Sequence, residues 1–123
     1  MGLSSSMENY LETIYLVEKE HGHAHIKDIA QAIKISMPSV NQALKKLKKA
    51  KLLDSKRYGP VHLTEKGRSV AEKIFQRHKI ISDFLCLVLG ADRRTAEEDA
   101  CRIEHILSLS TFEKLQSFMA TKT

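Results

Sequence analysis

Two short helical patterns separated by a tight turn constrain the fold of this chain more than any other feature. Apolar residues recur at helical spacing in residues 26–33 and again in residues 36–51, as on one face of an amphipathic helix. The small side chain of Ala30 stands where the two helices would cross. Lys34 and Ile35 occupy the turn, where glycine is usual because the backbone often turns left-handed there. Two short helices joined in this way are typical of a helix-turn-helix.

The next segment changes from helical to strand periodicity. Residues 52–58 and 61–63 read as strands, and Gly59 and Pro60 lie between them. Glycine and proline confined to the turn between two such runs predict a β-hairpin. A hairpin directly after a helix-turn-helix is the wing of a winged helix, so we expect a mainly α fold with a small β-hairpin wing.

Helical periodicity also predicts elements on both sides of the winged helix. A first helix, residues 7–21, takes Ser6 as its N-cap. A long helix runs from Thr64 to about Leu89 and ends at Gly90. The last two elements are a helix that begins at Asp92 or Thr95 and a helix over about 111–120 that starts with a capping box at Ser110 and Glu113.

The excess positive charge lies entirely in the first half of the chain. Residues 1–70 hold twelve Lys/Arg and seven Asp/Glu, whereas residues 71–123 hold eight of each, so the net charge of +5 belongs to the first segment. Basic charge clustered on a helix-turn-helix indicates a nucleic-acid partner. We expect a winged helix-turn-helix DNA-binding domain over residues 1–70 and a helical domain over residues 71–123. A lysine-rich surface made for solubility is the alternative.

The second helix of the motif is the predicted recognition helix. Asparagine and glutamine pair bidentately with adenine in the major groove, whereas lysines bind phosphates. An ordinary helical hairpin with a lysine-rich surface is the alternative interpretation. The predicted DNA-contacting residues are Ser36, Pro38, Ser39, Asn41, Gln42, Lys45, Lys46 and Lys49 around this helix, with Lys56 and Arg57 on the wing.

A second candidate site lies in residues 98–105, which read as helix because neither glycine nor proline interrupts them. Cys101, Glu104 and His105 occupy positions i, i+3 and i+4, which share one helical face. A thiolate, a carboxylate and an imidazole together suit a transition metal. They form only part of a coordination shell, so further ligands must come from elsewhere in the chain.

The order of these elements, with the run from Asp99 to His105, resembles the diphtheria-toxin-repressor family of metal-dependent transcriptional repressors. This family includes the iron-dependent repressors and the manganese transport regulators. The resemblance extends from Met7 to about Phe118 and is most specific at residues 7–12, at Arg77-His78 and in the run that carries the cysteine. It implies a homodimer that represses metal-homeostasis genes by binding a palindromic operator in double-stranded DNA. It also implies a second domain for metal binding and dimerisation, in the short form without the family's SH3-like domain.

The resemblance further implies a set of metal ligands. Cys101 matches the iron repressors, whereas the manganese branch carries a glutamate at this position. Asn9 stands where the manganese branch has an aspartate and the iron branch a methionine. Ser82 and Glu97 depart from the glutamate and the histidine that the family offers for an ancillary metal. Cys101, Glu104 and His105 match the primary site of the iron repressors, and Glu12 and His78 match ligands of the manganese branch. Asn9 matches neither branch, but its side-chain carbonyl can still ligate, so we expect it in the ligand set as well.

The ligand types also bear on which metal binds. One soft thiolate among harder ligands favours Fe(II), Co(II), Ni(II) or Zn(II) over Mn(II). Cellular availability also decides occupancy, so we expect Fe(II) as the cofactor and Mn(II) as the second choice. Co(II), Ni(II) or Zn(II) are expected to bind in vitro.

The end of the chain is unusually apolar for a neutral segment. Its apolar side chains belong either to an internal core or to a dimer interface, and we expect the interface because helix-turn-helix proteins usually read paired half-sites. The residues concerned are Ile106, Leu107, Leu109, Phe112, Leu115 and Phe118.

Neither a membrane segment nor a secretory signal is expected. No apolar run approaches the roughly 20 residues that span a bilayer, and the first six residues contain no basic segment followed by an apolar stretch. We therefore expect a cytoplasmic protein, with Cys86 and Cys101 as free thiols or ligands rather than a disulfide.

Three other functions fit parts of the sequence. The chain would be a winged-helix regulator without a metal sensor if Cys101 were a core thiol. It would be a small metal enzyme if the ligands activated water, or a metal storage module if metal did not affect DNA binding. Neither an oxyanion-hole signature nor a glycine-rich phosphate loop accompanies the ligands, so we expect no enzyme.

Overall fold

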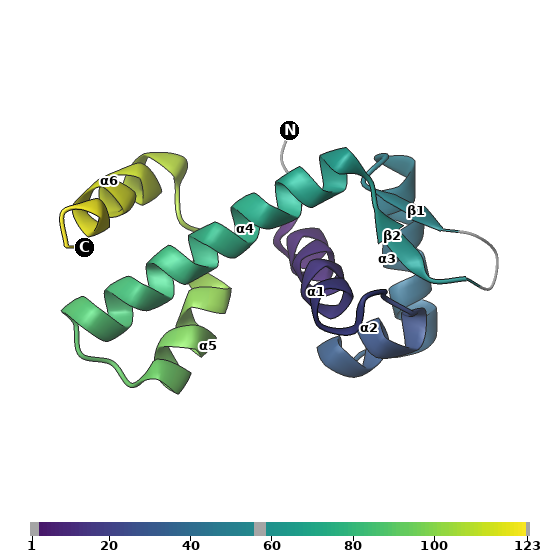
Figure 1. Cartoon of the computed structure of the whole chain (residues 1–123), viewed down its shortest axis with the longest axis horizontal. Helices are drawn as coiled ribbons and strands as arrows, with labels where there is room; N and C mark the ends of the chain where they lie inside the picture. Colours follow the sequence, from purple (N-terminus) through teal and green to yellow (C-terminus); the bar gives the residue numbers. More distant parts are fainter. Residues whose placement is uncertain (1–2, 56–58, 123) are drawn as a thin grey trace. The chain divides into compact units, whose positions relative to one another are not determined.

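The computed structural model describes residues 3–55 and 59–122 (Figure 1). Its described elements are helices apart from one two-stranded sheet, which confirms the expected fold class. The chain divides into two compact units, residues 1–72 and residues 73–123, and the boundary lies inside a long helix. No helix within the described ranges is long and apolar enough to cross a membrane.

The first unit contains the predicted winged helix-turn-helix. Its elements are α1 (Ser5–His21), α2 (Ile26–Ile33), α3 (Met37–Lys49), β1 (Leu53–Ser55) and β2 (Val61–Leu63). The helix α1 contacts α2, α3 and β2, so the motif and the hairpin share one core with it (Figure 1). The strands pair antiparallel with Leu53 opposite Leu63. The most deeply buried apolar side chains of this core are Leu11, Ile14, Ile29, Val40, Leu47 and Val61.

The turn between α2 and α3 closes without a glycine. Lys34 adopts the left-handed conformation, with a φ of 64°, at a turn position where glycine is usual. The amides of Lys34 and Ile35 both donate to the carbonyl of Ala30, at 2.8 and 3.1 Å. Ser36 is the N-cap of α3, as predicted, and its hydroxyl accepts a hydrogen bond from the Ser39 amide at 3.4 Å.

Two other helices begin earlier than the sequence predicted. The N-cap of α1 is Ser4 rather than Ser6, and its hydroxyl accepts a hydrogen bond from the amide three residues on, at 3.2 Å. The N-cap of α6 (Leu109–Ala120) is Ser108 rather than Ser110, with the same bond at 3.2 Å. Each segment offers more than one serine, and the serine with extended backbone becomes the cap.

The second unit is built from four helical segments of the described chain. They are the second half of α4 (Glu65–Asp83), a π-helical turn (Phe84–Val88), α5 (Arg93–Ile103) and α6. Gly90, with a φ of 78°, follows the long helix at the predicted position. Ile81, Ala100 and Phe112 form the buried centre of the unit.

Asp92 is the N-cap of α5, one of the two predicted starts. Its carboxylate accepts hydrogen bonds from the Thr95 hydroxyl and amide and from the Arg94 amide, and these bonds lower the pKa of Asp92. The cap therefore fixes the beginning of the helix that leads to the candidate ligands.

Gly67 on α4 lies directly against the segment that enters the hairpin. A Cβ atom at this position would lie 2.0 Å from the carbonyl oxygen of Leu52. Thr64 completes the junction, because its hydroxyl donates to the Lys51 carbonyl at 2.7 Å and accepts from the Gly67 amide at 3.0 Å. These contacts hold the end of α3, the start of β1 and the start of α4 together.

We predict that Gly67→Ala destabilises the first unit. The added methyl group meets backbone, which cannot rotate away, and such overpacking costs roughly 1–3 kcal/mol. Urea denaturation followed by circular dichroism measures the effect. Ser69→Ala, at an exposed position of the same helix, is the matched control, and equal midpoints for the two variants would contradict the close packing at Gly67.

Candidate metal centre

The candidate ligands lie at the end of α5, and the helix is shorter than the sequence predicted. The expectation of helix through residue 105 is wrong for the last two residues, because α5 ends at Ile103. Glu104 is the C-cap and His105 lies in the following turn. The amides of Ile106 and Leu107 both donate to the carbonyl of Ile103, at 3.0 and 2.9 Å, which turns the chain away from the helix axis.

Arg77 on α4 provides the physical reason for this helix end. Its Nη2 donates to the carbonyl of Glu104 at 2.5 Å and to the carbonyl of Leu107 at 3.3 Å. The guanidinium also lies 5.5 Å from the centre of the Phe112 ring. Carbonyls at a helix C-terminus lack partners within the helix, so a side chain from another element satisfies them here. Helical periodicity within residues 98–105 could not reveal this contact.

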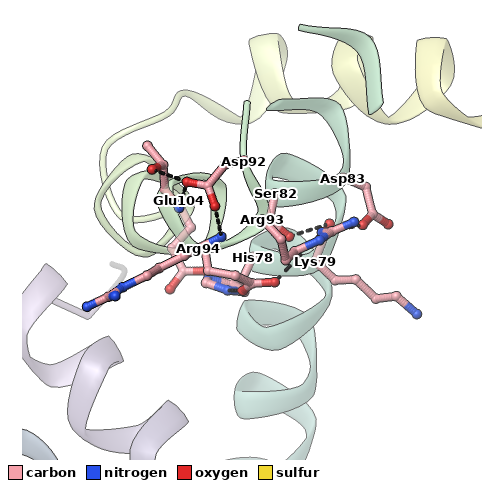
Figure 2. Close-up of polar contacts among 10 residues, drawn as sticks. His78, Lys79, Ser82, Asp83, Asp92, Arg93, Arg94 and Glu104 are labelled. Carbon is pink, nitrogen blue, oxygen red and sulfur yellow. Dashed lines mark hydrogen bonds and ion pairs between the residues drawn. The ribbon is translucent and has the colours of Figure 1, made fainter. Parts of the chain in front are cut away.

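His78, Glu104 and His105 come together in the second unit. Glu104 is 1% exposed. Its Oε2 lies 3.3 Å from Nδ1 of His78, and its Oε1 lies 3.3 Å from Nε2 of His105. Neither carboxylate oxygen accepts a hydrogen bond within the described part of the chain. Figure 2 shows the side chain of His78, on α4, close to that of Glu104, which follows the end of α5.

Each of these two distances fits a pair of ligands on a divalent cation. Metal–nitrogen and metal–oxygen bonds of about 2.1 Å at tetrahedral to octahedral angles place neighbouring donor atoms roughly 3.0–3.4 Å apart. The two imidazole–carboxylate separations lie within that range. A buried carboxylate that accepts no hydrogen bond is also costly unless a charge compensates it. The residues present therefore fit a metal centre.

The remaining predicted ligands occupy two elements. Cys101 lies on the last turn of α5, is half-buried and forms no disulfide. Asn9 and Glu12 lie one turn apart on α1, and Glu12 is 5% exposed. Because these two residues belong to the first unit, their ligation together with residues of the second stays a prediction.

The outer side of His78 carries contacts that sequence reasoning missed. Nε2 of His78 lies 2.5 Å from Oε2 of Glu97. Arg93 lies 3.7 Å from the other oxygen of Glu97 and donates to Asp83 at 3.1 Å (Figure 2), which raises the pKa of Arg93. Ser82 is buried, and its hydroxyl donates to the carbonyl of Lys79 at 3.1 Å. The i, i+4 spacing of Arg93 and Glu97 is the only sequence signal that points to this network.

The predicted DNA-contacting residues that the structure describes all lie on or beside α3. All of them are exposed, whereas Val40, Ala43, Leu44 and Leu47 of α3 are buried. This arrangement leaves the helix free to enter a groove. The exposed set is Ser36, Pro38, Ser39, Asn41, Gln42, Lys45, Lys46 and Lys49, whereas Lys56 and Arg57 lie outside the described residues.

A winged helix with an exposed basic recognition helix, followed by a helical unit with a carboxylate–imidazole cluster, defines a DNA-binding regulator with a candidate metal centre. Residues 2–61 match the model of the iron dependent repressor N-terminal DNA binding domain. Residues 64–122 match the iron dependent repressor metal binding and dimerisation domain. The chain therefore belongs to this family of metal-dependent transcriptional regulators.

Similar curated proteins agree with this assignment. The chain is 40% identical over 118 residues to an uncharacterized HTH-type transcriptional regulator of Methanocaldococcus jannaschii, covering 95% of this chain and 94% of that protein. It is 34% identical over 110 residues to the HTH-type transcriptional regulator MntR of Bacillus subtilis, covering 89% of this chain and 77% of MntR.

Solved structures of larger regulators share the fold. The manganese regulator SloR is 28% identical with a TM-score of 0.80, covering 98% of this chain and 55% of SloR. ScaR with bound Zn²⁺ is 28% identical with a TM-score of 0.78, covering 93% of this chain and 53% of ScaR. The chain thus spans about half the length of these two solved regulators.

We predict that Arg77→Met lowers the stability of the second unit. Loss of the guanidinium leaves the carbonyls of Glu104 and Leu107 without these donors, and an unsatisfied buried polar group costs roughly 1–3 kcal/mol. Urea denaturation of the metal-free chain measures the change. Arg94→Met is the control, because that side chain is 89% exposed and pairs with Glu98 on the helix surface. A variant as stable as the parent would show that the turn needs no guanidinium.

Proposed function

We propose that this chain is a metal-activated transcriptional repressor of metal-homeostasis genes. The observation that carries the proposal is the buried carboxylate of Glu104, whose two oxygens each lie 3.3 Å from an imidazole nitrogen. Membership in a family with a metal binding and dimerisation domain supports the same function. Family members are transcriptional regulators, and we propose no catalytic activity.

The proposed cofactor is Fe(II), with Mn(II) as the second candidate. The thiolate of Cys101 favours Fe(II), whereas carboxylates and imidazoles serve either metal. Among the similar proteins, MntR is named an HTH-type transcriptional regulator and SloR a manganese regulator. ScaR has been solved with bound Zn²⁺ and with bound Cd²⁺. The proposed ligands are Glu104, His105, His78 and Cys101 from the second unit, with Glu12 and Asn9 from the first.

The proposed ligand set suggests how metal affects DNA binding. A bound divalent cation would supply a link between residues of both units. Asn9 and Glu12 lie on α1, which packs against α2, α3 and β2, so a restraint on α1 also restrains the recognition helix. Metal would then favour the conformation that binds DNA. A hundredfold gain in DNA affinity requires a coupling free energy of about 2.7 kcal/mol.

The proposed target is a palindromic operator bound by a homodimer. Two recognition helices related by a twofold axis read half-sites about one turn of DNA apart. Asn41 and Gln42 are proposed to contact base edges, and Lys45, Lys46 and Lys49 to contact phosphates.

We predict that metal raises the affinity of the parent chain for operator DNA and that Glu104→Gln abolishes the rise. The amide is nearly isosteric but carries no charge, so it is a much poorer ligand. Anaerobic fluorescence anisotropy with promoter DNA from the protein's own gene, titrated with Fe(II) and then Mn(II), measures affinity. A chelator must reverse the effect.

Glu98→Gln is the matched control for this experiment, because it removes the same charge from a side chain that is 63% exposed on α5, the helix that precedes Glu104. It should respond to metal as the parent does. Tight operator binding by the parent that is indifferent to metal and chelator would favour a winged-helix regulator without a metal sensor. Metal binding without any effect on DNA affinity would favour a storage module.

We predict different effects for the two classes of recognition-helix residue. Lys45→Ala should weaken binding to all sequences alike and reduce the salt slope by about 0.9. Asn41→Ala should cost roughly 1–3 kcal/mol on the operator and little on random DNA. Lys114→Ala, an exposed lysine of α6, controls for net charge. Equal losses for Lys45→Ala and Lys114→Ala would rule out a local phosphate contact.

A further inference from the structure

The outer edge of the candidate metal centre contains a carboxylate whose position the proposed ligand set does not explain. Glu97 lies on α5 with its side chain 46% exposed, and His78 lies on α4 with its side chain 17% exposed. Their side chains meet at 2.5 Å through Nε2 and Oε2. The same imidazole presents its other nitrogen, Nδ1, to Glu104 at 3.3 Å. His78 therefore lies between two carboxylates in two different geometries.

The short contact has the geometry of a hydrogen bond rather than of two ligands on one metal. Donor atoms that share a cation stand roughly 3.0–3.4 Å apart, whereas Nε2 and Oε2 of Glu97 are 2.5 Å apart. An ionised carboxylate only accepts hydrogen bonds, so Nε2 of His78 is the nitrogen that carries the proton.

The contact between His78 and Glu104 does not have the geometry of a hydrogen bond. At 3.3 Å, Nδ1 of His78 and Oε2 of Glu104 are farther apart than a usual N–H···O hydrogen bond of 2.7–3.2 Å. With the proton on Nε2, Nδ1 of the neutral ring is a lone-pair donor toward Glu104. The two facing lone pairs are the arrangement that a shared cation satisfies.

We propose that Glu97 is a positioning residue that fixes His78 in the Nε2–H tautomer and so directs Nδ1 to the metal. This inference rests on the proposed metal-dependent function and adds a residue outside the ligand set. Ligating histidines commonly donate their second nitrogen to a carboxylate, which fixes the tautomer and the ring orientation.

The surroundings of Glu97 hold it in this role. Its second oxygen lies 3.7 Å from Arg93, which is itself hydrogen-bonded to Asp83. Ser82, one turn after His78, offers no carboxylate, and its hydroxyl donates to the Lys79 carbonyl. A pocket of about 280 Å³ lies beside these residues, so a second cation at His78 and Glu97 is the competing outcome that the experiment must separate.

The experiment compares the full-length parent chain with Glu97→Ala, Glu97→Gln and Glu98→Ala. Long-range ¹H–¹⁵N NMR of the metal-free chain identifies the His78 tautomer, and a His78→Asn variant assigns the signal. Anaerobic competition with a fluorescent chelator gives the affinity and the stoichiometry for Mn(II) and Co(II). Urea denaturation checks that the variants fold, which the exposure of Glu97 favours.

The expected result is an Nε2–H tautomer in the parent and a mixture in Glu97→Ala. The affinity of Glu97→Ala for the first metal equivalent should fall 10–100-fold. Glu97→Gln, whose amide oxygen still accepts the hydrogen bond, should restore the tautomer and most of the affinity. Glu98→Ala should match the parent.

Three results would overturn the inference. The first is an Nδ1–H or doubly protonated His78 in the metal-free parent, which needs no variant to observe. The second is a Glu97→Ala variant that binds metal as tightly as the parent does. This result would leave the proposed function intact. The third is loss of a second metal equivalent with the first unchanged, which would make Glu97 a ligand. A parent that binds no metal would refute the proposed function itself.

Discussion

A buried carboxylate whose oxygens accept no hydrogen bond within the described part of the chain is the constraint on which the second unit depends. Glu104 is 1% exposed, and its two oxygens face imidazoles rather than a lysine or an arginine. Burying a charge costs several kcal/mol unless it is compensated. The guanidinium of Arg77 donates to the backbone carbonyls of Glu104 and Leu107 rather than to this carboxylate. A divalent cation between this carboxylate and the imidazole nitrogens that face it would compensate the buried charge.

The position at which α5 ends determines where the side chains of Glu104 and His105 lie. A continued helix would keep Glu104 and His105 on neighbouring positions of one face, as the sequence predicted. The observed turn places them after the last helical residue, Ile103, where Arg77 holds the backbone from the outside. Two proposed ligands on a turn that is fixed by a second element retain a defined geometry without helical hydrogen bonds of their own. The contact of α4 with this turn therefore supports the candidate metal centre.

The sequence predicted the parts of the fold that depend on local signals. Helical spacing, the Ser36 cap and the Gly59-Pro60 turn lie within the segments they define, and the winged helix follows from them. The left-handed backbone of Lys34 lies at a turn position where glycine is usual, and the lysine itself did not predict it. The wrong caps of α1 and α6 arose because each segment offers more than one serine, and helical spacing does not show which serine adopts extended backbone. Contacts between distant residues, such as Arg77 with Glu104, have no periodic signature, so neither this helix end nor the pairing of His78 with Glu97 could be read from spacing.

Residues 82 and 97 bear together on how many metals the second unit can hold. An imidazole whose Nε2 carries a proton for Glu97 has only Nδ1 left as a ligand, so His78 cannot serve cations on both of its sides. A glutamate at position 82 would favour a cation on the outer side and would compete with the hydrogen bond to Glu97. Ser82 removes that competition, because its hydroxyl donates to the helix backbone. Under the proposed role of Glu97, the two departures from the family pattern therefore reinforce each other. The missing carboxylate at position 82 weakens an outer site, and the carboxylate at position 97 directs the shared histidine to the inner one.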